Sequence, residues 1–233
     1  MTPAAISGGS GGTLRFFEST IFKKAVMALT GALLFGFVSA HLLGNLQIFL
    51  GQDRLNEYAA FLKSNAEILW GARTVLLLSV AAHIIATIQL ANLNKQARPV
   101  GYAKKNNSHS TLASRTMYYS GPMIAAFVVY HLLHFTTGTL HPDFSEHDVY
   151  SNIIVGFQRW PVAVSYLVAV GLLCMHLSHG VSSMFQSLGF SHPQHTPRIR
   201  FVARLVGILY FAGYASIPTA VLVGILRAPN VRL

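Results

Sequence analysis

Six histidines of this sequence lie inside long apolar stretches, where ionisable side chains are rare. The stretches are each roughly 20 residues or longer and run over 24–50, 68–92, 116–140, 161–187 and 201–226. The histidines occupy the first four of them: His41, His83, His131, His134, His176 and His179. An ionisable residue inside a membrane is costly, so each one is a candidate for function. A neutral imidazole can ligate iron or relay a proton.

Four of these histidines fall at two matched depths. His41 and His131 lie 17 and 15 residues after the starts of their stretches, roughly 22 to 26 Å at the rise of an α-helix. His83 and His176 lie 9 and 11 residues before the ends of theirs, roughly 13 to 17 Å from the same side and about 10 Å from the first pair. Two imidazole pairs on four antiparallel helices favour bis-histidine ligation of two b-type haems.

Transmembrane helices must position these side chains. Of the 233 residues, 52% are hydrophobic and only 10% are charged, which is typical of a membrane protein. We therefore predict an all-α integral membrane protein, a five-transmembrane-helix bundle with two haems b between the first four helices. Residues 1–15 are predicted to form a flexible tail and residues 16–233 a single domain. Residues 52–65 are predicted to form an amphipathic interfacial helix and residues 142–152 a polar loop.

The charge pattern predicts how the chain is oriented. The formal net charge of +10 comes from basic residues between apolar stretches, which membrane topology explains better than nucleic-acid binding. Eleven of the 17 Lys and Arg lie on the N-terminal side of the bundle, and all acidic residues except Glu18 lie on the other side. Since cytoplasmic loops carry the excess of Lys and Arg, we expect a bacterial inner (plasma) membrane protein with a cytoplasmic N-terminus and an external C-terminus.

Five motifs follow one another along residues 16–226. They are H-L-L-G-N at 41–45, L-N-E-Y-A-A-F-L at 55–62, the lone His83, S-G-P-M-I-A-A-F-V-V-Y-H ending at His131, and H-L-S-H-G at 176–180. In this order and spacing they resemble the dihaem cytochrome b membrane anchor of succinate:quinone oxidoreductases and fumarate reductases, the complex II family. The resemblance implies the ligand pairs His41/His131 and His83/His176. The histidines three residues further on, His134 and His179, are the alternates.

The resemblance also implies a role in electron transport and partner subunits. The chain would pass electrons between an iron–sulfur subunit and a membrane quinone, with menaquinone expected. The iron–sulfur subunit would dock to a flavoprotein that carries FAD and the dicarboxylate site of the tricarboxylic acid cycle enzyme. This chain would be the quinone-reacting membrane subunit and inactive on succinate alone. One departure is Cys174, because some fumarate-reducing members carry a glutamate there as part of a proton path.

A quinone head group needs an apolar pocket at the membrane surface and a few polar groups that deliver protons. The residues expected near such a pocket at the outer surface are Asn45, Asn56, Tyr58, Glu67, Trp70 and Arg73. Glu67 is the candidate proton relay. Arg115 and Arg204 at the cytoplasmic end, and Arg73 at the outer end, are candidate partners for haem propionates, the alternative being that they only anchor the topology.

Three other readings of the histidines stay open. The histidines could hydrogen-bond between helices without any cofactor. The chain could be the cytochrome b subunit of a membrane formate dehydrogenase or hydrogenase. It could also be a non-haem proton-coupled transporter, for which broken helices around a midplane site are typical. Any haem would be bound noncovalently, because Cys174 is the single cysteine and covalent attachment needs a C-x-x-C-H segment.

Overall fold

The computed structural model describes residues 16–97, 112–190 and 192–228, and its regular elements over these ranges are all helices. In chain order they are α2 (Thr20–Leu46), η1 (Gln47–Leu50), α3 (Gln52–Ser64), α4 (Ala66–Gln96), α5 (Leu112–Phe135), α6 (Val149–Gln158), α7 (Trp160–Ser187) and α8 (Thr196–Leu222). The predicted tail, 1–15, lies outside the described residues, as does most of the loop between α4 and α5.

Local sequence signals fix the starts of these helices. The side chains of Ser19, Asn65 and Asp148 each accept a hydrogen bond from a backbone N–H in the first turn of α2, α4 and α6. These hydrogen bonds satisfy backbone amides that have no partner within the helix. Pro161 and Pro197 stand in the first turns of α7 and α8, where the missing N–H costs nothing.

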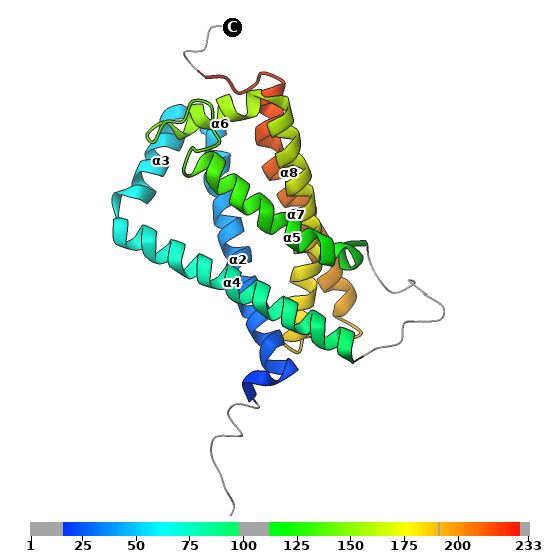
Figure 1. Ribbon diagram of the computed structural model, residues 1–233. Helices are drawn as coiled ribbons and strands as arrows, with labels where there is room; N and C mark the ends of the chain where they lie inside the picture. The colour runs from blue at the N-terminus through cyan, green and yellow to red at the C-terminus, as the bar shows by residue number, and fades with distance from the viewer. Residues whose placement is uncertain (1–15, 98–111, 191, 229–233) are drawn as a thin grey trace, which may run out of the picture.

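The long helices form two layers. α2, α7 and α8 pack against one another, while α4 lies on α2 and α5 lies on α7. Figure 1 shows α4 and α5 crossing the other three diagonally on the near side of the molecule. The start of α2 and the end of α8 lie at opposite ends of the bundle (Figure 1).

Four helical segments are long and apolar enough to cross a membrane: Thr20–Leu50, Ala66–Gln96, Trp160–Ser187 and Thr196–Leu222. They correspond to the first, second, fourth and fifth predicted spans. Large apolar side chains along them face outward, such as Leu77 at 70% exposure and Ile208 at 65%. Large exposed apolar surfaces are rare on soluble monomers, so these faces suit lipid. The described structure is thus consistent with a multi-pass membrane protein.

The third predicted span, 116–140, differs from the structure at its end. α5 stops at Phe135, and both Thr136 and Thr137 donate their backbone N–H to the carbonyl of Leu132. Gly138 then takes a φ of +72°, and a Cβ there would lie 2.2 Å from the ring of Phe144. Only glycine fits that backbone and that space, so the chain turns where an uninterrupted helix was predicted. α5 is not among the four candidate spans.

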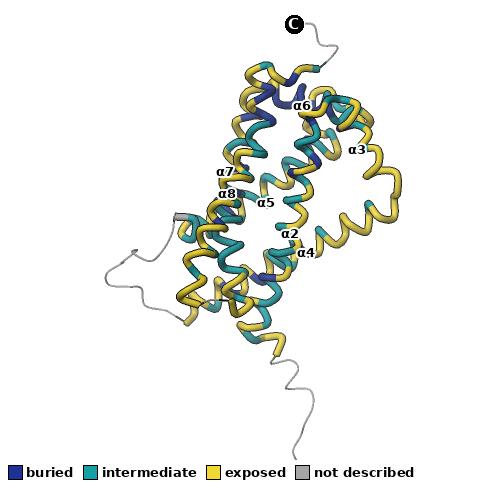
Figure 2. The backbone as a smooth tube through the Cα atoms, turned by 180° about the vertical axis from the view of Figure 1, so that it is seen from behind, coloured by how far each residue is buried: buried dark blue, intermediate teal, exposed yellow. Residues whose placement is uncertain are grey.

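The helix α6 was not predicted, because residues 142–152 were expected to be a polar loop. Its apolar side chains are instead part of the described hydrophobic core, whose members are Ile48, Leu55, Tyr150, Ile153, Ile154, Phe157, Ala163, Tyr166, Ile217, Ala220, Val221 and Leu226. These residues come from η1, α3, α6, the start of α7, the end of α8 and, for Leu226, the turn that follows α8. Figure 2 shows the buried positions gathered around α6. We call η1, α3, α6 and the loop 136–148 the cap.

Hydrogen bonds between distant segments hold the cap together. The amides of Gln52 and Asn56 each donate to the Asp148 carboxylate at 2.9 Å. His141, in the loop of the cap, is only 8% exposed. Its Nδ1 accepts from the backbone of Asp143, so its Nε2–H donates to the carbonyl of Asn152 at 2.8 Å. The predicted helix at 52–65 is present as α3.

Candidate cofactor site

The rings of His41 and His131 are in edge-type contact between α2 and α5, near the cap. Their centroids are 5.8 Å apart and their planes are nearly perpendicular, at 84°. Two imidazoles that bind one metal from opposite sides, through bonds of about 2 Å, need centroids about 6 Å apart. Each ring also stacks on the phenylalanine one turn earlier, Phe37 or Phe127. The spacing therefore fits one iron held between the two rings.

The second pair, His83 and His176, is oriented by hydroxyl groups on neighbouring helices. Thr30 Oγ1 lies 3.1 Å from His83 Nδ1 and donates its own proton to the Val26 carbonyl at 2.7 Å. With its proton on the Val26 carbonyl, the hydroxyl can accept from His83 Nδ1–H, and in that tautomer Nε2 carries no proton. Metal-bound histidines are commonly fixed in this way by an acceptor at the other ring nitrogen.

His176 has the same arrangement on the opposite side. Its Nδ1 lies 3.3 Å from Ser120 Oγ, whose residue is only 1% exposed. The closest acceptor for the Ser120 proton is the carbonyl of Met117, at 3.5 Å. His176 also lies within electrostatic range of His83. In His83 and in His176, a hydroxyl group on a neighbouring helix thus lies within hydrogen-bonding distance of Nδ1.

The two histidine pairs join helices that do not pack closely in the described structure. α2 packs on α4, and α5 packs on α7, whereas α2 and α5, like α4 and α7, make few or no close backbone contacts. A flat ring bound between the predicted partners would therefore lie between helices whose backbones make few or no close contacts. Gly31 has no side chain, which lets the His83 ring lie close to the backbone of α2. A Cβ atom at Gly31 would lie 3.4 Å from His83 Cε1.

The distance between the two pairs follows from α2 and α5. Thr30 contacts His83 and lies 11 residues before His41 on α2. Ser120 contacts His176 and lies 11 residues before His131 on α5. Both intervals correspond to about 16 Å of helix. The sequence count of about 10 Å refers to depth across the membrane and stays a prediction, because α4 and α5 cross the other long helices diagonally (Figure 1).

The alternates His134 and His179 have other partners. His134 is 1% exposed, and its Nδ1 lies 3.0 Å from the hydroxyl of Tyr166. His179 Nε2 lies 3.0 Å from Ser183 Oγ on its own helix. In the described residues no group of three or more His, Cys, Asp or Glu could hold a bare metal ion. Two-imidazole sites suit an iron whose remaining ligands come from a macrocycle.

The structure places the six predicted quinone residues in different local surroundings. Asn56 bonds Asp148 and the backbone of Tyr150, and Tyr58 packs on the backbone of Gly44. Arg73 Cζ lies 4.9 Å from the Trp70 ring centroid, and both residues are exposed, as is Glu67. Asn45 is partly buried near the end of α2. The hollow between α5 and α7, and the one between α2 and α4, are lined by other residues.

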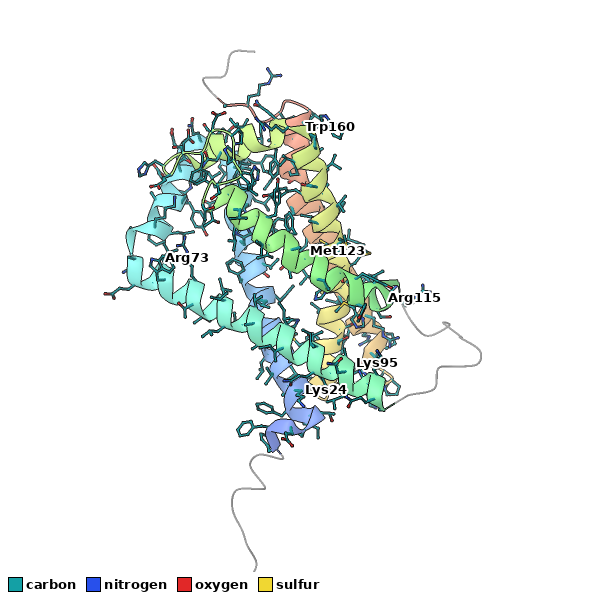
Figure 3. All side chains as sticks on the ribbon, viewed as in Figure 1. Lys24, Arg73, Lys95, Arg115, Met123 and Trp160 are labelled. Carbon is teal, nitrogen blue, oxygen red and sulfur yellow. The ribbon has the colours of Figure 1, made fainter. Side chains whose placement is uncertain are left out.

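Basic side chains mark the end of the bundle opposite the cap. Figure 3 shows Lys24 and Lys95 toward that end, Arg115 at the start of α5, and Trp160 beside the cap. Arg73 lies at the start of α4 (Figure 3). Arg115 and Arg204 are both exposed, so their guanidinium groups are accessible to an anionic partner at the membrane surface.

Three contact residues were missed from the sequence: Thr30, Ser120 and Tyr166. Each carries a hydroxyl within an otherwise apolar helix and bonds the ring nitrogen of a histidine on another helix. Polar residues in membrane helices commonly bond across to a neighbour, so their presence in the apolar stretches was an available signal. Their partners are 53, 56 and 32 residues away, which spacing within one helix does not reveal.

Comparisons with models of protein families, with curated protein sequences and with solved structures found no match to this chain.

Proposed function

We propose that this chain is the membrane anchor and dihaem cytochrome b subunit of a succinate:quinone oxidoreductase. The proposal is supported by the contact between the His41 and His131 rings and by the hydroxyl groups at Nδ1 of His83 and His176. His41 and His131 are spaced as two axial ligands of one iron, and His83 and His176 each have Nδ1 held by a hydroxyl. A random set of interhelical histidines has no reason to pair across helices that are kept apart.

When bound, a haem supplies reversible one-electron transfer at its iron. The chain's own part would be to bind, orient and shield the group. His41, His131, His83 and His176 would provide the axial nitrogens, and Thr30 and Ser120 would set the tautomers of the second pair. Two sites about 16 Å apart along the bundle would carry electrons across much of the apolar layer.

In this proposal α5 is the fifth membrane crossing. It has 24 residues, a length of about 36 Å, which exceeds the roughly 30 Å of a hydrocarbon core. An odd number of crossings would also agree with the opposite positions of the α2 start and the α8 end (Figure 1). We place the basic end at the cytoplasm and the cap outside a bacterial inner membrane, by the excess of Lys and Arg.

The partners in this proposal are an iron–sulfur subunit and an FAD flavoprotein at the basic end, with menaquinone as the electron acceptor or donor. The quinone would react at the outer surface, where Asn45, Glu67, Trp70 and Arg73 are the candidates without a described role in holding the cap. Glu67, exposed in the first turn of α4, is proposed to relay protons there. Full quinone turnover in a Glu67→Gln complex would disprove that role.

The first experiment is a dithionite-reduced minus oxidised spectrum of the purified full-length chain, with haem quantitation. The proposal expects two low-spin b-type haems per chain, and a colourless chain would refute it and favour a transporter. The second is purification from native membranes. Co-purifying FAD and iron–sulfur subunits would support complex II, whereas a molybdenum or nickel subunit would identify a formate dehydrogenase or hydrogenase.

A further inference from the structure

Tyr166 on α7 places one hydroxyl between two histidine rings of α5. The Tyr166 oxygen lies 3.0 Å from His134 Nδ1 and 3.4 Å from His131 Nδ1. The first distance is ordinary for a hydrogen bond and the second is long. Tyr166 is 6% exposed and lies in the core of the cap, so neither water nor lipid competes for its hydroxyl.

Proton counting assigns the direction of both contacts. If His131 binds iron through Nε2, its single proton is on Nδ1 and must be accepted by the Tyr166 oxygen. The Tyr166 proton then goes to His134 Nδ1, and His134 keeps its own proton on Nε2. This is the arrangement in which the hydroxyl serves both rings and His131 still presents a free nitrogen.

His134 is held too firmly to exchange roles with His131. Its ring stacks on Tyr130 at a 5.5 Å centroid distance and lies 4.1 Å from Phe135 and 5.1 Å from His141. α6 closes over it at Gly156, where a Cβ would lie 3.0 Å from His134 Cε1. His134 therefore fixes the position of the Tyr166 hydroxyl, which in turn faces His131.

We propose that Tyr166 is the positioning residue of the His131 ligand, with His134 as its anchor. This inference rests on the proposed haem sites. It adds that the two sites differ in the group that contacts Nδ1 of a histidine ligand. The site near the cap has a phenol–imidazole pair behind one ligand, whereas the other site has the aliphatic hydroxyls of Thr30 and Ser120. An acceptor at Nδ1 makes the ligating nitrogen more basic and favours ferric iron.

The test compares Tyr166→Phe with Tyr214→Phe in the haem-loaded complex. Tyr214 is the matched control, because its ring lies 6.2 Å from His41, the other ligand of the same site, and its hydroxyl donates to the Val38 carbonyl at 2.7 Å instead of to a ligand. The readouts are haem content, the midpoint potential of each haem and the electron paramagnetic resonance spectrum of the ferric form.

For Tyr166→Phe we expect an upward shift in the midpoint potential of one haem only, with a change in its ferric spectrum, or selective loss of that haem. Tyr214→Phe should match the wild type. His134→Leu should reproduce the Tyr166→Phe shift, and His134→Asn, whose side-chain oxygen can stand in for Nδ1, should reverse it. Unchanged potentials in Tyr166→Phe, or equal shifts in both tyrosine variants, would overturn the inference. Absence of haem from the wild-type chain would instead overturn the proposed function.

Discussion

Gly31 and His83 are in contact across the α2–α4 interface: a Cβ atom on Gly31 would lie 3.4 Å from His83 Cε1. That distance is ordinary van der Waals contact, so a methyl group fits and a branched side chain does not. We expect Gly31→Ala to keep two haems per chain and Gly31→Leu to displace the His83 ring and lose one of them. Haem quantitation against protein concentration measures this. Retention of both haems in Gly31→Leu would contradict the placement of His83 as a ligand.

Thr30 should matter for its hydroxyl and not for its volume. Thr30→Val removes the acceptor of His83 Nδ1–H, and loss of such a partner lowers metal-site affinity by about 10–100-fold. Thr30→Ser should retain the affinity. Thr87→Val is the matched control, because Thr87 bonds the backbone carbonyl of His83 at 2.8 Å and not its ring. Haem retention through repeated detergent washes compares the variants, and equal loss in Thr30→Val and Thr87→Val would show that orientation is not the cause.

The two histidines of α5 should behave differently when replaced. His131→Ala should lose one haem, whereas His134→Asn should keep two, since His134 is packed against the cap. His41→Ala and the double variant His41→Ala/His131→Ala should lose the same single haem, because both ligands serve one site and their effects do not add. Reduced-minus-oxidised spectra of the four variants give the answer. A double variant that loses both haems would argue for a different pairing.

Asp148 should make the stability of the cap depend on pH in the acidic range. Burial alone would raise the pKa of its carboxyl, but hydrogen bonds from Ser151, Asn56 and Gln52 outweigh that effect and hold the pKa below its ordinary 3.8. A carboxylate with a lowered pKa stabilises the fold above its ordinary pKa, and the contribution disappears as the pH falls through the lowered value.

Asp148→Ala is therefore expected to lower the free energy of unfolding by about 1 kcal/mol at neutral pH, because the side-chain hydrogen bond at the N-terminus of α6 is lost. The difference in unfolding stability between this variant and the wild type should shrink as the pH falls below 3.8. Thermal unfolding in detergent across that range measures it. Asp143→Ala is the control, since that residue is exposed and contributes its backbone amide to the cap. If the stability difference between Asp148→Ala and the wild type stays constant down to strongly acidic pH, the Asp148 carboxylate is not the source of the pH dependence.

Apolar length predicted most of the helices because it is a strong signal on its own. The first, second, fourth and fifth spans appear as α2, α4, α7 and α8, with ends within a few residues of those expected. α5 and α6 were predicted less well for identifiable reasons. The positive φ of Gly138 ends α5 early. α6 has only ten residues, and its burial depends on contacts with α3, α7 and α8 that no local pattern contains.

The sequence predicted only part of the candidate site, because contacts between distant helices are not contained in a local pattern. Helical rise places His41 beside His131, because one regular parameter converts residue number into depth. It does not show which ring faces which hydroxyl, so Ser120 and Tyr166 were missed. The six quinone candidates were chosen by proximity to span ends, and the structure assigns Asn56 to holding the cap.

The cap has a consequence for how the protein is made. The described core lies at one end of the bundle, and the pairs α2/α5 and α4/α7 make few or no close backbone contacts in the part of the chain that the structure describes. A newly inserted chain would therefore be fastened at the cap and comparatively open along its length. A ligand that binds only the folded form stabilises it by mass action, so under the proposed function haem supply would determine how long the chain persists in the membrane. Under haem starvation we expect the protein to disappear from membranes while its messenger RNA persists.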